Sequence, residues 1–185
     1  MLLDVVILPP AKLLGKIGKK ITEAVRGMSA VFVADNQKLI SRISLFHIRI
    51  KKNRLEKLSQ KVQEVIKKHR QFIMKSTGTF LEPKTEWIIW FSLNNSAAFI
   101  KLHREIVESC YRFRTGMMPF NPERILRLKK AHITLAKLKN REDAESAFRE
   151  LQNVKFSFRV NEVAITEVNF WHQVTRVIKR FKFGR

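Results

Sequence analysis

The sequence predicts an α+β protein in which helices and strands are mixed along a single chain of 185 residues. Apolar residues recur at helical spacing in some segments and at strand spacing in others. Two strand-like segments, Phe72–Leu81 and Trp87–Leu93, flank a turn at Pro83 in the manner of a β-hairpin. A strand–turn–helix unit also occurs once in each half of the chain. The length fits one domain that comprises residues 1–185.

The first half of the chain predicts strands and two amphipathic helices. A strand at Leu2–Leu8 precedes a helix that ends at Gly27, and a second helix follows the basic turn at Lys51–Asn53. Between the helices we expect strands at Ala30–Ala34 and Arg42–Ile50, which are rich in β-formers. Each helix carries lysines opposite an apolar stripe, formed by Leu14, Ile17, Ile21 and Val25 in the first and by Leu55, Leu58, Val62 and Val65 in the second.

The second half predicts further strands around two more helices. Asn95 or Ser96 caps a helix whose inward side carries Phe99, Leu102, Ile106, Cys110 and Phe113. The segment Thr115–Arg124 is predicted to be a loop and a candidate lid or rim. A strand at His132 leads through a basic turn into a helix that begins with acidic residues, followed by strands near Val154–Val160 and Val163–Phe170. The remainder, Trp171–Arg185, is predicted to be a basic aromatic tail, either solvated or guiding a nucleic acid.

The composition is that of a folded and strongly basic protein. Hydrophobic residues make up 45% of the chain, which excludes a largely disordered protein. Thirty-seven Lys and Arg residues against sixteen Asp and Glu residues give a formal net charge of +21. The positive side chains repel one another, so the simplest explanation for their number is a polyanionic partner. This partner could be a nucleic acid or an anionic membrane surface. A basic surface without such a partner is the alternative.

The cysteine content and the N-terminal segment restrict the cellular setting. Cys110 is the only cysteine, which excludes an internal disulfide and a cysteine zinc cluster, and we expect a reducing, cytoplasmic location. The segment Met1–Leu8 contains Asp4 and lacks a basic leader, so it is predicted to be a strand and not a signal peptide. No apolar run reaches the ~18 residues of a membrane span.

Two histidines occupy equivalent places in the two strand–turn–helix units. The strands read His47-Ile48-Arg49-Ile50 and His132-Ile133-Thr134-Leu135. Side chains alternate between the two faces of a strand, so each histidine is expected on the same side as the residue two positions later, Arg49 or Thr134. A duplicated unit would place the histidines around a pseudo-twofold axis, facing one cleft. A single histidine on such a strand is more often structural, and it is the pair that favours a functional site.

Two imidazoles on either side of a phosphate suit the cleavage of a phosphodiester. One removes a proton from the attacking water or hydroxyl while the other protonates the departing oxygen, and imidazole titrates near neutral pH. A threonine hydroxyl beside them can donate a hydrogen bond to a non-bridging phosphoryl oxygen. The sequence lacks an obvious carboxylate cluster for Mg²⁺ or Mn²⁺, so we expect no metal and no other cofactor. The pattern leaves open which histidine is the acid and which is the base.

With these two tetrapeptides, its strand–helix opening and its β-rich end, the chain resembles the two-histidine phosphoesterase superfamily, and most of all its 2′,5′ RNA ligase or RNA 2′,3′-cyclic phosphodiesterase branch. The resemblance implies a bilobal fold with two antiparallel-rich sheets lining a central cleft and helices outside. It implies hydrolysis of 2′,3′-cyclic phosphate at RNA ends, or reversible 2′,5′ joining, with His47 and His132 as catalytic imidazoles and Thr134 as a phosphate-binding hydroxyl. The family has Thr or Ser where this chain has Arg49, whose guanidinium either binds phosphate instead or obstructs the pocket.

The remaining aromatic residues and histidines divide into two groups. Phe120, Phe170 and Trp171 flank the loop or the tail and are candidates for stacking a terminal base, whereas Trp87, Trp90 and Phe91 are predicted to lie in the core. His69, His103 and His172 are predicted to be structural or to face phosphate. Two main hypotheses result: an RNA-end phosphoesterase, and an RNA-binding module of the same fold whose Arg49 marks lost chemistry. A membrane-surface role for the basic helices is a third, and the oligomeric state is left open.

Overall fold

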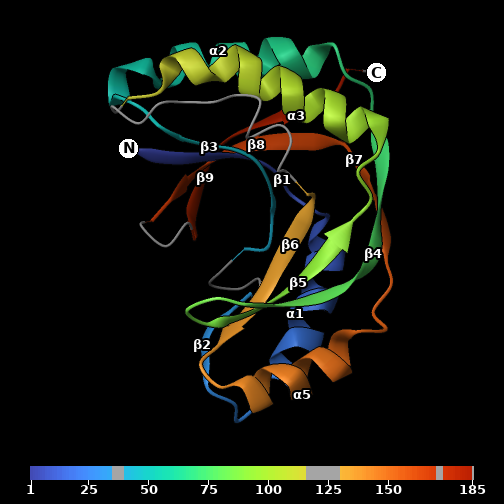
Figure 1. Cartoon of the computed structure of the whole chain (residues 1–185). Coiled ribbons are helices and arrows are strands. Elements are labelled where there is room, and N and C mark those ends of the chain that lie inside the picture. Colours follow the sequence, from blue (N-terminus) through green and yellow to red (C-terminus); the bar gives the residue numbers. More distant parts are fainter. Residues whose placement is uncertain (35–39, 116–129, 170–172, 185) are drawn as a thin grey trace.

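The computed structural model describes residues 1–34, 40–115, 130–169 and 173–184 (Figure 1). The strands in this part of the chain are β1 (Leu2–Ile7), β2 (Ala30–Val33), β3 (Ile43–Arg49), β4 (Phe72–Pro83), β5 (Trp87–Leu93), β6 (His132–Leu138), β7 (Ser157–Val160), β8 (Glu162–Val168) and β9 (Val174–Lys182). The helices are α1 (Ala11–Ala24), α2 (Leu55–Lys67), α3 (Ala97–Cys110) and α5 (Arg141–Leu151), with 3₁₀ turns η1 (Lys52–Arg54) and η2 (Tyr111–Phe113).

The strands form two antiparallel sheets. The four-stranded sheet has the order β3-β1-β8-β9, and the five-stranded sheet has the order β2-β6-β5-β4-β7. β4 leaves its hairpin with β5 and curves along one side of the molecule until it pairs with β7, which gives the second sheet its curled shape (Figure 1). Antiparallel sheets with separately packed helices confirm the α+β class that the sequence predicts.

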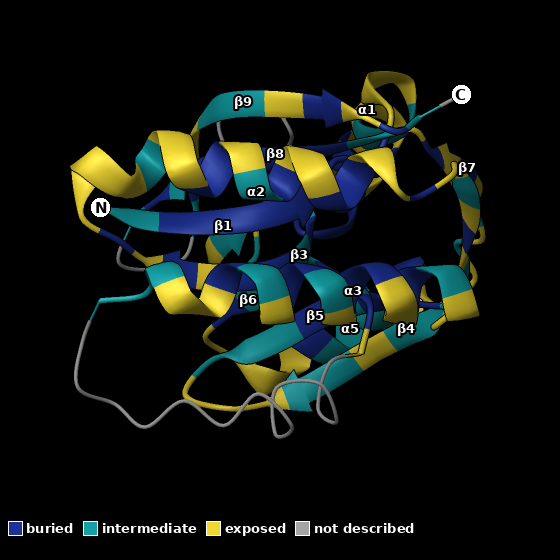
Figure 2. Ribbon diagram, turned by 90° about the horizontal axis from the view of Figure 1, so that it is seen from above, coloured by how far each residue is buried: buried dark blue, intermediate teal, exposed yellow. Residues whose placement is uncertain are grey.

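The helices pack on the sheets through apolar faces. α2 and α3 lie together over the four-stranded sheet, while α5 packs against β4, β5 and β6 with α1 beside it (Figure 1). Along α2 and α3, buried and exposed residues alternate with the turn of the helix (Figure 2). Val62 and Leu102 from these helices join Leu3 of β1 and Phe91 of β5 in one hydrophobic cluster, so the core connects both sheets.

Two signals for helix ends act as the sequence predicts. The Ser96 side chain caps α3 by accepting a hydrogen bond from the Phe99 N–H at 3.2 Å. Gly27 follows α1 with a φ of 75°, a left-handed conformation that glycine adopts without a Cβ clash. The predicted strand Val154–Val160 is shorter in the structure and begins at Ser157, and the predicted lid lies outside the described residues from position 116 onward.

The prediction of a C-terminal tail is wrong for the part that the structure describes. Val174–Lys182 forms β9, which pairs along its length with β8. Val174 and Phe181 of this strand are buried, each 4% exposed, as is Phe183 just after it at 6%. The basic residues of this segment form ion pairs with glutamates on β8, Arg176 with Glu167 and Arg180 with Glu162. The partners that turn a basic segment into a strand are therefore distant in the sequence.

The duplicated unit is present, once in each sheet. β3 continues through η1 into α2, which covers the four-stranded sheet, and β6 continues into α5, which covers the five-stranded sheet. Within the described segments, no helix combines the length and the apolar character that a membrane span requires.

Candidate active site

The two strands that carry the histidines lie next to each other although they belong to different sheets. β3 is an edge strand of the four-stranded sheet and β6 lies inside the five-stranded sheet, and Cα atoms of the two strands come within 8 Å. β6 begins beneath the four-stranded sheet and runs away from it toward α5 (Figure 1). His132 is the first residue of β6, so it lies at the end of the strand that is directed toward the four-stranded sheet.

The side chains on both strands alternate as the sequence predicts. His47 and Arg49 are exposed, and His132 and Thr134 are half-buried. The aliphatic residues between them face the core, since Ile48 is 1% exposed and Ile133 is 0% exposed. The polar pair of each motif is therefore accessible, as a site for an external ligand requires.

A buried carboxylate supports His47. Asp4 on β1 pairs with His47 across the sheet and is 0% exposed. Its Oδ2 accepts hydrogen bonds from the Ser44 hydroxyl at 2.6 Å and from Arg42 Nε at 2.8 Å, and lies 3.5 Å from His47 Nδ1. A buried carboxylate requires such partners, because an unpaired buried charge is costly. The carboxylate favours the His47 tautomer with its proton on Nδ1, so Nε2 carries the lone pair of the neutral ring.

A β-bulge brings the Asp4 partners to one face. β1 and β3 pair in register at Val5 and Phe46, but Val6 then faces Ser44, which leaves Leu45 as an extra residue. One extra residue reverses the alternation, so Ser44 and His47, three positions apart, lie on the same side of the sheet. Without the bulge, Ser44 would point away from the carboxylate.

The ring of His132 is held by a backbone carbonyl and an aromatic neighbour. His132 Nδ1 lies 2.9 Å from the carbonyl oxygen of Lys130. A carbonyl oxygen only accepts, so Nδ1 carries the proton and Nε2 carries the lone pair of the neutral ring. The ring also meets Trp90 edge to face, with centroids 5.4 Å apart and planes at 62°. Both predicted catalytic histidines thus use Nδ1 for support from the protein.

The remaining motif residues flank the histidines on the same strands. Thr134 is directly opposite Trp90 in the pairing of β5 with β6. The backbone carbonyl of Arg49 accepts hydrogen bonds from the N–H and hydroxyl of Thr115, which fixes the end of β3, while the Arg49 side chain extends into solvent. Each histidine strand thus carries one further polar side chain, a guanidinium on β3 and a hydroxyl on β6.

Sequence reasoning missed an aromatic pair beside His132. Trp90 stacks on Phe80 with centroids 4.8 Å apart and planes at 17°. Trp90 was predicted to lie in the core, but it is only half-buried, and Phe80 is 48% exposed. The three residues predicted to stack a base, Phe120, Phe170 and Trp171, all lie outside the described residues.

The other singled-out residues in the described part have structural surroundings. His69 is 7% exposed and its Nε2 lies 3.0 Å from Glu105 Oε2, while the His103 ring stacks on Phe99. Burial raises the pKa of the Cys110 thiol to about 12, so this cysteine is neither charged nor nucleophilic at neutral pH. Phe91 is fully buried, as predicted, and His172 lies outside the described residues.

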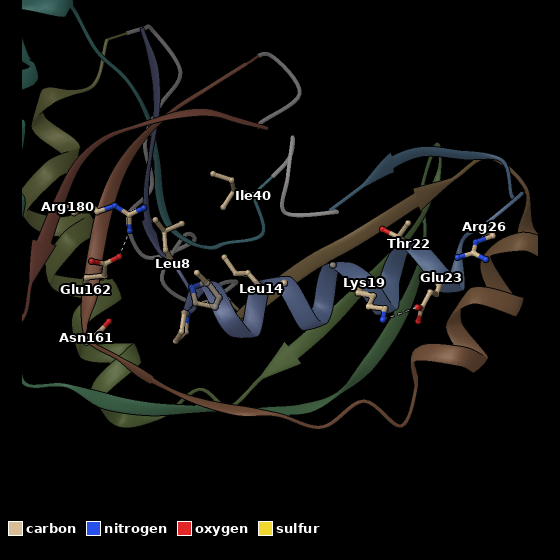
Figure 3. Close-up of a pocket in the computed structure, with 15 residues that line it drawn as sticks. Leu8, Leu14, Lys19, Thr22, Glu23, Arg26, Ile40, Asn161, Glu162 and Arg180 are labelled. Atoms are coloured by element: carbon tan, nitrogen blue, oxygen red, sulfur yellow. Dashed lines mark hydrogen bonds and ion pairs between the residues drawn. The ribbon is translucent and has the colours of Figure 1, made fainter.

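A cavity of about 880 Å³ opens between α1 and the four-stranded sheet (Figure 3). Leu8 and Leu14 line one end, and Lys19 and Arg26 lie at the other. Its described lining includes neither predicted catalytic histidine. Leu8 is four residues beyond Asp4, which places the cavity ~13 Å along the chain from the carboxylate. The cavity therefore lies apart from the two predicted catalytic histidines.

Among the described residues, no three His, Cys, Asp or Glu side chains are grouped so as to hold a metal ion. The groups at the candidate site are two imidazoles, a hydroxyl and a guanidinium. Their chemistry is proton transfer and the binding of an anionic oxygen.

The family model described as the 2′-5′ RNA ligase superfamily matches residues 42–172, which include both histidine motifs. The chain belongs to the 2′-5′ RNA ligase superfamily. The resemblance inferred from the two tetrapeptides is thereby confirmed. Asp4 precedes the matched region, so its contact with His47 is known from the structure and not from the family match. No curated protein matches the chain by sequence.

Solved structures similar to this superfamily member confirm the fold. E. coli LigT complexed with 3′-AMP is 13% identical, with a TM-score of 0.68 over 99% of this chain and 98% of that one. TT0787 of Thermus thermophilus is 18% identical, with a TM-score of 0.65 over 100% of both chains. Usb1 of Kluyveromyces marxianus is 10% identical, with a TM-score of 0.59 over 98% of both chains. The two-sheet architecture is thus shared at low sequence identity.

Proposed function

We propose that this protein is a metal-independent phosphoesterase that hydrolyses 2′,3′-cyclic phosphate at RNA ends, with His47 and His132 as its acid–base pair. The observation that carries the proposal is the approach of β3 to β6, with each histidine ring contacted by a protein oxygen at Nδ1. Membership of the superfamily and a net charge of +21, suited to an RNA backbone, support it. LigT, which shares the fold, has been crystallised with 3′-AMP.

The proposed reaction is an in-line displacement at phosphorus. One histidine takes a proton from water as the water oxygen bonds to phosphorus, and the other gives a proton to the ribose oxygen whose bond to phosphorus breaks. The product is a ribose with one free hydroxyl and one phosphomonoester. If the 5′-hydroxyl of a second RNA replaces water and the 2′-oxygen keeps the phosphate, the same steps join the two ends by a 2′,5′ linkage.

Thr134 and Arg49 bind the phosphate in this proposal. The Thr134 hydroxyl donates to a non-bridging oxygen, on which negative charge increases in the transition state. The Arg49 guanidinium supplies a fixed positive charge at the position where the family has a hydroxyl. The buried Asp4 acts on the reaction through His47, whose tautomer and orientation it holds.

The direct test is turnover of an oligonucleotide that ends in a 2′,3′-cyclic phosphate. We expect His47→Ala and His132→Ala each to lower kcat by ~10²–10⁴, the scale of a lost acid–base group, while RNA binding persists. The double variant should be little worse than either single one, because the two groups act together. Full activity of either single variant, or loss of wild-type activity with EDTA, would overturn the proposal.

A second candidate function is an RNA-binding module that has lost the chemistry, and Arg49 is the observation that favours it. Its exposed side chain stands where the family places a small hydroxyl. If this reading is correct, the wild-type protein is inactive on the cyclic phosphate and an Arg49→Thr variant gains activity. Activity of the wild type that falls when Arg49 is replaced supports the phosphoesterase instead.

A further inference from the structure

We propose that Phe80 and Trp90 form a platform that stacks the base of the nucleotide carrying the cyclic phosphate. This inference rests on the proposed function, which places the phosphate at His132. It deepens that function by naming how the terminal nucleoside is held. The two rings are parallel within 17° at 4.8 Å, and Trp90 also contacts the ring of His132. The platform therefore adjoins one of the two proposed catalytic groups.

The exposure of Phe80 distinguishes this pair from core packing. Phe80 is 48% exposed, which forgoes part of the hydrophobic stabilisation that a buried phenylalanine provides. One face of its ring is covered by Trp90, so the accessible area belongs to the opposite face and the edge. An aromatic ring fixed on one side and open on the other is the arrangement on which nucleobases stack, whatever their identity.

The register of the five-stranded sheet places the platform in a row with the phosphate-binding residue. Phe80 on β4 is directly opposite Trp90 on β5, and Trp90 is directly opposite Thr134 on β6. These three residues share one face of the sheet, and two strand spacings, ~10 Å, separate the first from the last. A nucleotide with its base on Phe80 and its phosphate beside Thr134 would lie across this row.

Small residues form the adjacent row on the same face. Gly78 is opposite Ser92, and Ser92 is opposite His132. The Phe80 ring lies over Gly78, because its Cε2 atom is 3.5 Å from the position that a Cβ atom on Gly78 would occupy. The ring therefore leans toward the row formed by Gly78, Ser92 and His132. Gly78 and Ser92 have small side chains, so in this proposal the ribose lies over their row, beside the platform. The terminal nucleoside thus has a place for its base, its sugar and its phosphate.

The test compares two substrates that differ only in the base: a nucleoside 2′,3′-cyclic phosphate and the methyl riboside 2′,3′-cyclic phosphate, which has none. For Phe80→Ala we expect KM for the nucleoside substrate to rise about 5- to 150-fold, as the loss of one base–aromatic stack predicts, with kcat nearly unchanged. KM for the methyl riboside should not change. Equal KM values of wild type and Phe80→Ala on the nucleoside substrate would overturn the platform.

Two further variants control for stability and ring chemistry. Ile73→Ala removes another exposed apolar side chain from β4, where Ile73 is 50% exposed, and should leave both KM values unchanged. Phe80→Tyr keeps an aromatic face and should retain most of the affinity. A rise in KM for Ile73→Ala as large as that for Phe80→Ala would assign the effect to β4 as a whole and overturn the inference.

A binding measurement separates failure of this inference from failure of the proposed function. Calorimetric titration with 3′-AMP and with ribose 3-phosphate requires no turnover. If the wild type is inactive but binds 3′-AMP more tightly than Phe80→Ala does, the phosphoesterase proposal fails and the platform stands. If the wild type is active and Phe80→Ala binds 3′-AMP equally well, the phosphoesterase stands and the platform fails.

Discussion

The two histidine strands carry the same motif in different surroundings. β3 is an edge strand, and its histidine is supported by the carboxylate of Asp4, which is itself held by Arg42 and Ser44. β6 is an interior strand, and its histidine is supported by a neutral carbonyl and by Trp90. The motif therefore determines which face of the strand each imidazole occupies, whereas the surrounding backbone and strands determine how each one is held. A charged support on one side and a dipole on the other make the two halves of the site chemically unequal.

Beyond the replacement of a histidine itself, the largest effect should come from the residues that follow the histidines, where the motifs themselves differ. We expect Thr134→Val to lower kcat on a cyclic-phosphate oligonucleotide by ~10²–10³, because it removes a hydrogen-bond donor needed most in the transition state. Arg49→Ala should act mainly on KM, since an exposed guanidinium binds substrate and transition state alike. Steady-state kinetics of both variants measure this split. Equal losses in kcat would show that the two motifs contribute in the same way.

A smaller effect is expected from the buried support of His47. Asp4→Asn keeps an acceptor but removes the charge, so we expect kcat to fall by ~10–10² and the kcat–pH profile to shift, as happens when the partner that orients a histidine is lost. RNA binding should persist. Thr166→Val is the matched control, because the buried Thr166 hydroxyl donates to the Asp4 backbone carbonyl at 3.1 Å and does not contact the carboxylate.

Stability alone does not explain this predicted loss of activity. Thr166→Val should cost about 1 kcal/mol of unfolding free energy with no change in the pH profile. Asp4→Asn should also reduce stability, since it leaves the Arg42 guanidinium without its charged partner. If Asp4→Asn lowers the melting temperature but leaves kcat and its pH profile as in the wild type, Asp4 supports only the fold.

The sequence predicts the histidines and their facing because both depend on local alternation. His47 and Arg49 are two residues apart, as are His132 and Thr134, and no distant information is needed to place each pair on one side of a strand. The same reasoning identifies the hairpin of β4 and β5 and the cap at Ser96. Local patterns of this kind can be read from one sequence, although the three solved structures compared above are only 10–18% identical to it.

The features that sequence reasoning missed depend on pairing between distant strands. Asp4 reaches His47 only through the register of β1 with β3, and a bulge at Leu45 is required to bring Ser44 to the same face. Phe80 and Trp90 have the pattern of core residues, and their accessibility follows from which face of the hairpin the helices leave uncovered. The basic segment in β9 has the composition of a tail until the glutamates of β8 lie beside it.

The smallest effect concerns the helices that follow the two histidine strands. Neither α2 nor α5 has a side-chain hydrogen bond from its N-cap residue, but α5 is tied to the residue before β2 by Asp143, whose Oδ2 accepts a hydrogen bond from the Ser29 N–H at 2.8 Å. The hydrogen bonds from Ser29 lower the pKa of the Asp143 carboxyl below its usual 3.8. The ionised carboxylate therefore stabilises the folded state at pH values above 3.8, and this contribution disappears as the pH falls through the lowered pKa.

We accordingly expect Asp143→Ala to have a lower melting temperature than the wild type at pH 7 and for the difference to shrink as the pH falls below 3.8. Glu142→Ala is the matched control, because Glu142 occupies the same first turn of α5 and shares its favourable interaction with the helix dipole. Thermal unfolding of the three proteins between pH 3 and pH 7 decides the matter. If the difference in melting temperature for Asp143→Ala stays constant with pH, or if Glu142→Ala shows the same difference, the Asp143–Ser29 hydrogen bond does not stabilise α5. The N-terminal ends of α2 and α5 would then be held in the same way, by packing and by the helix dipole.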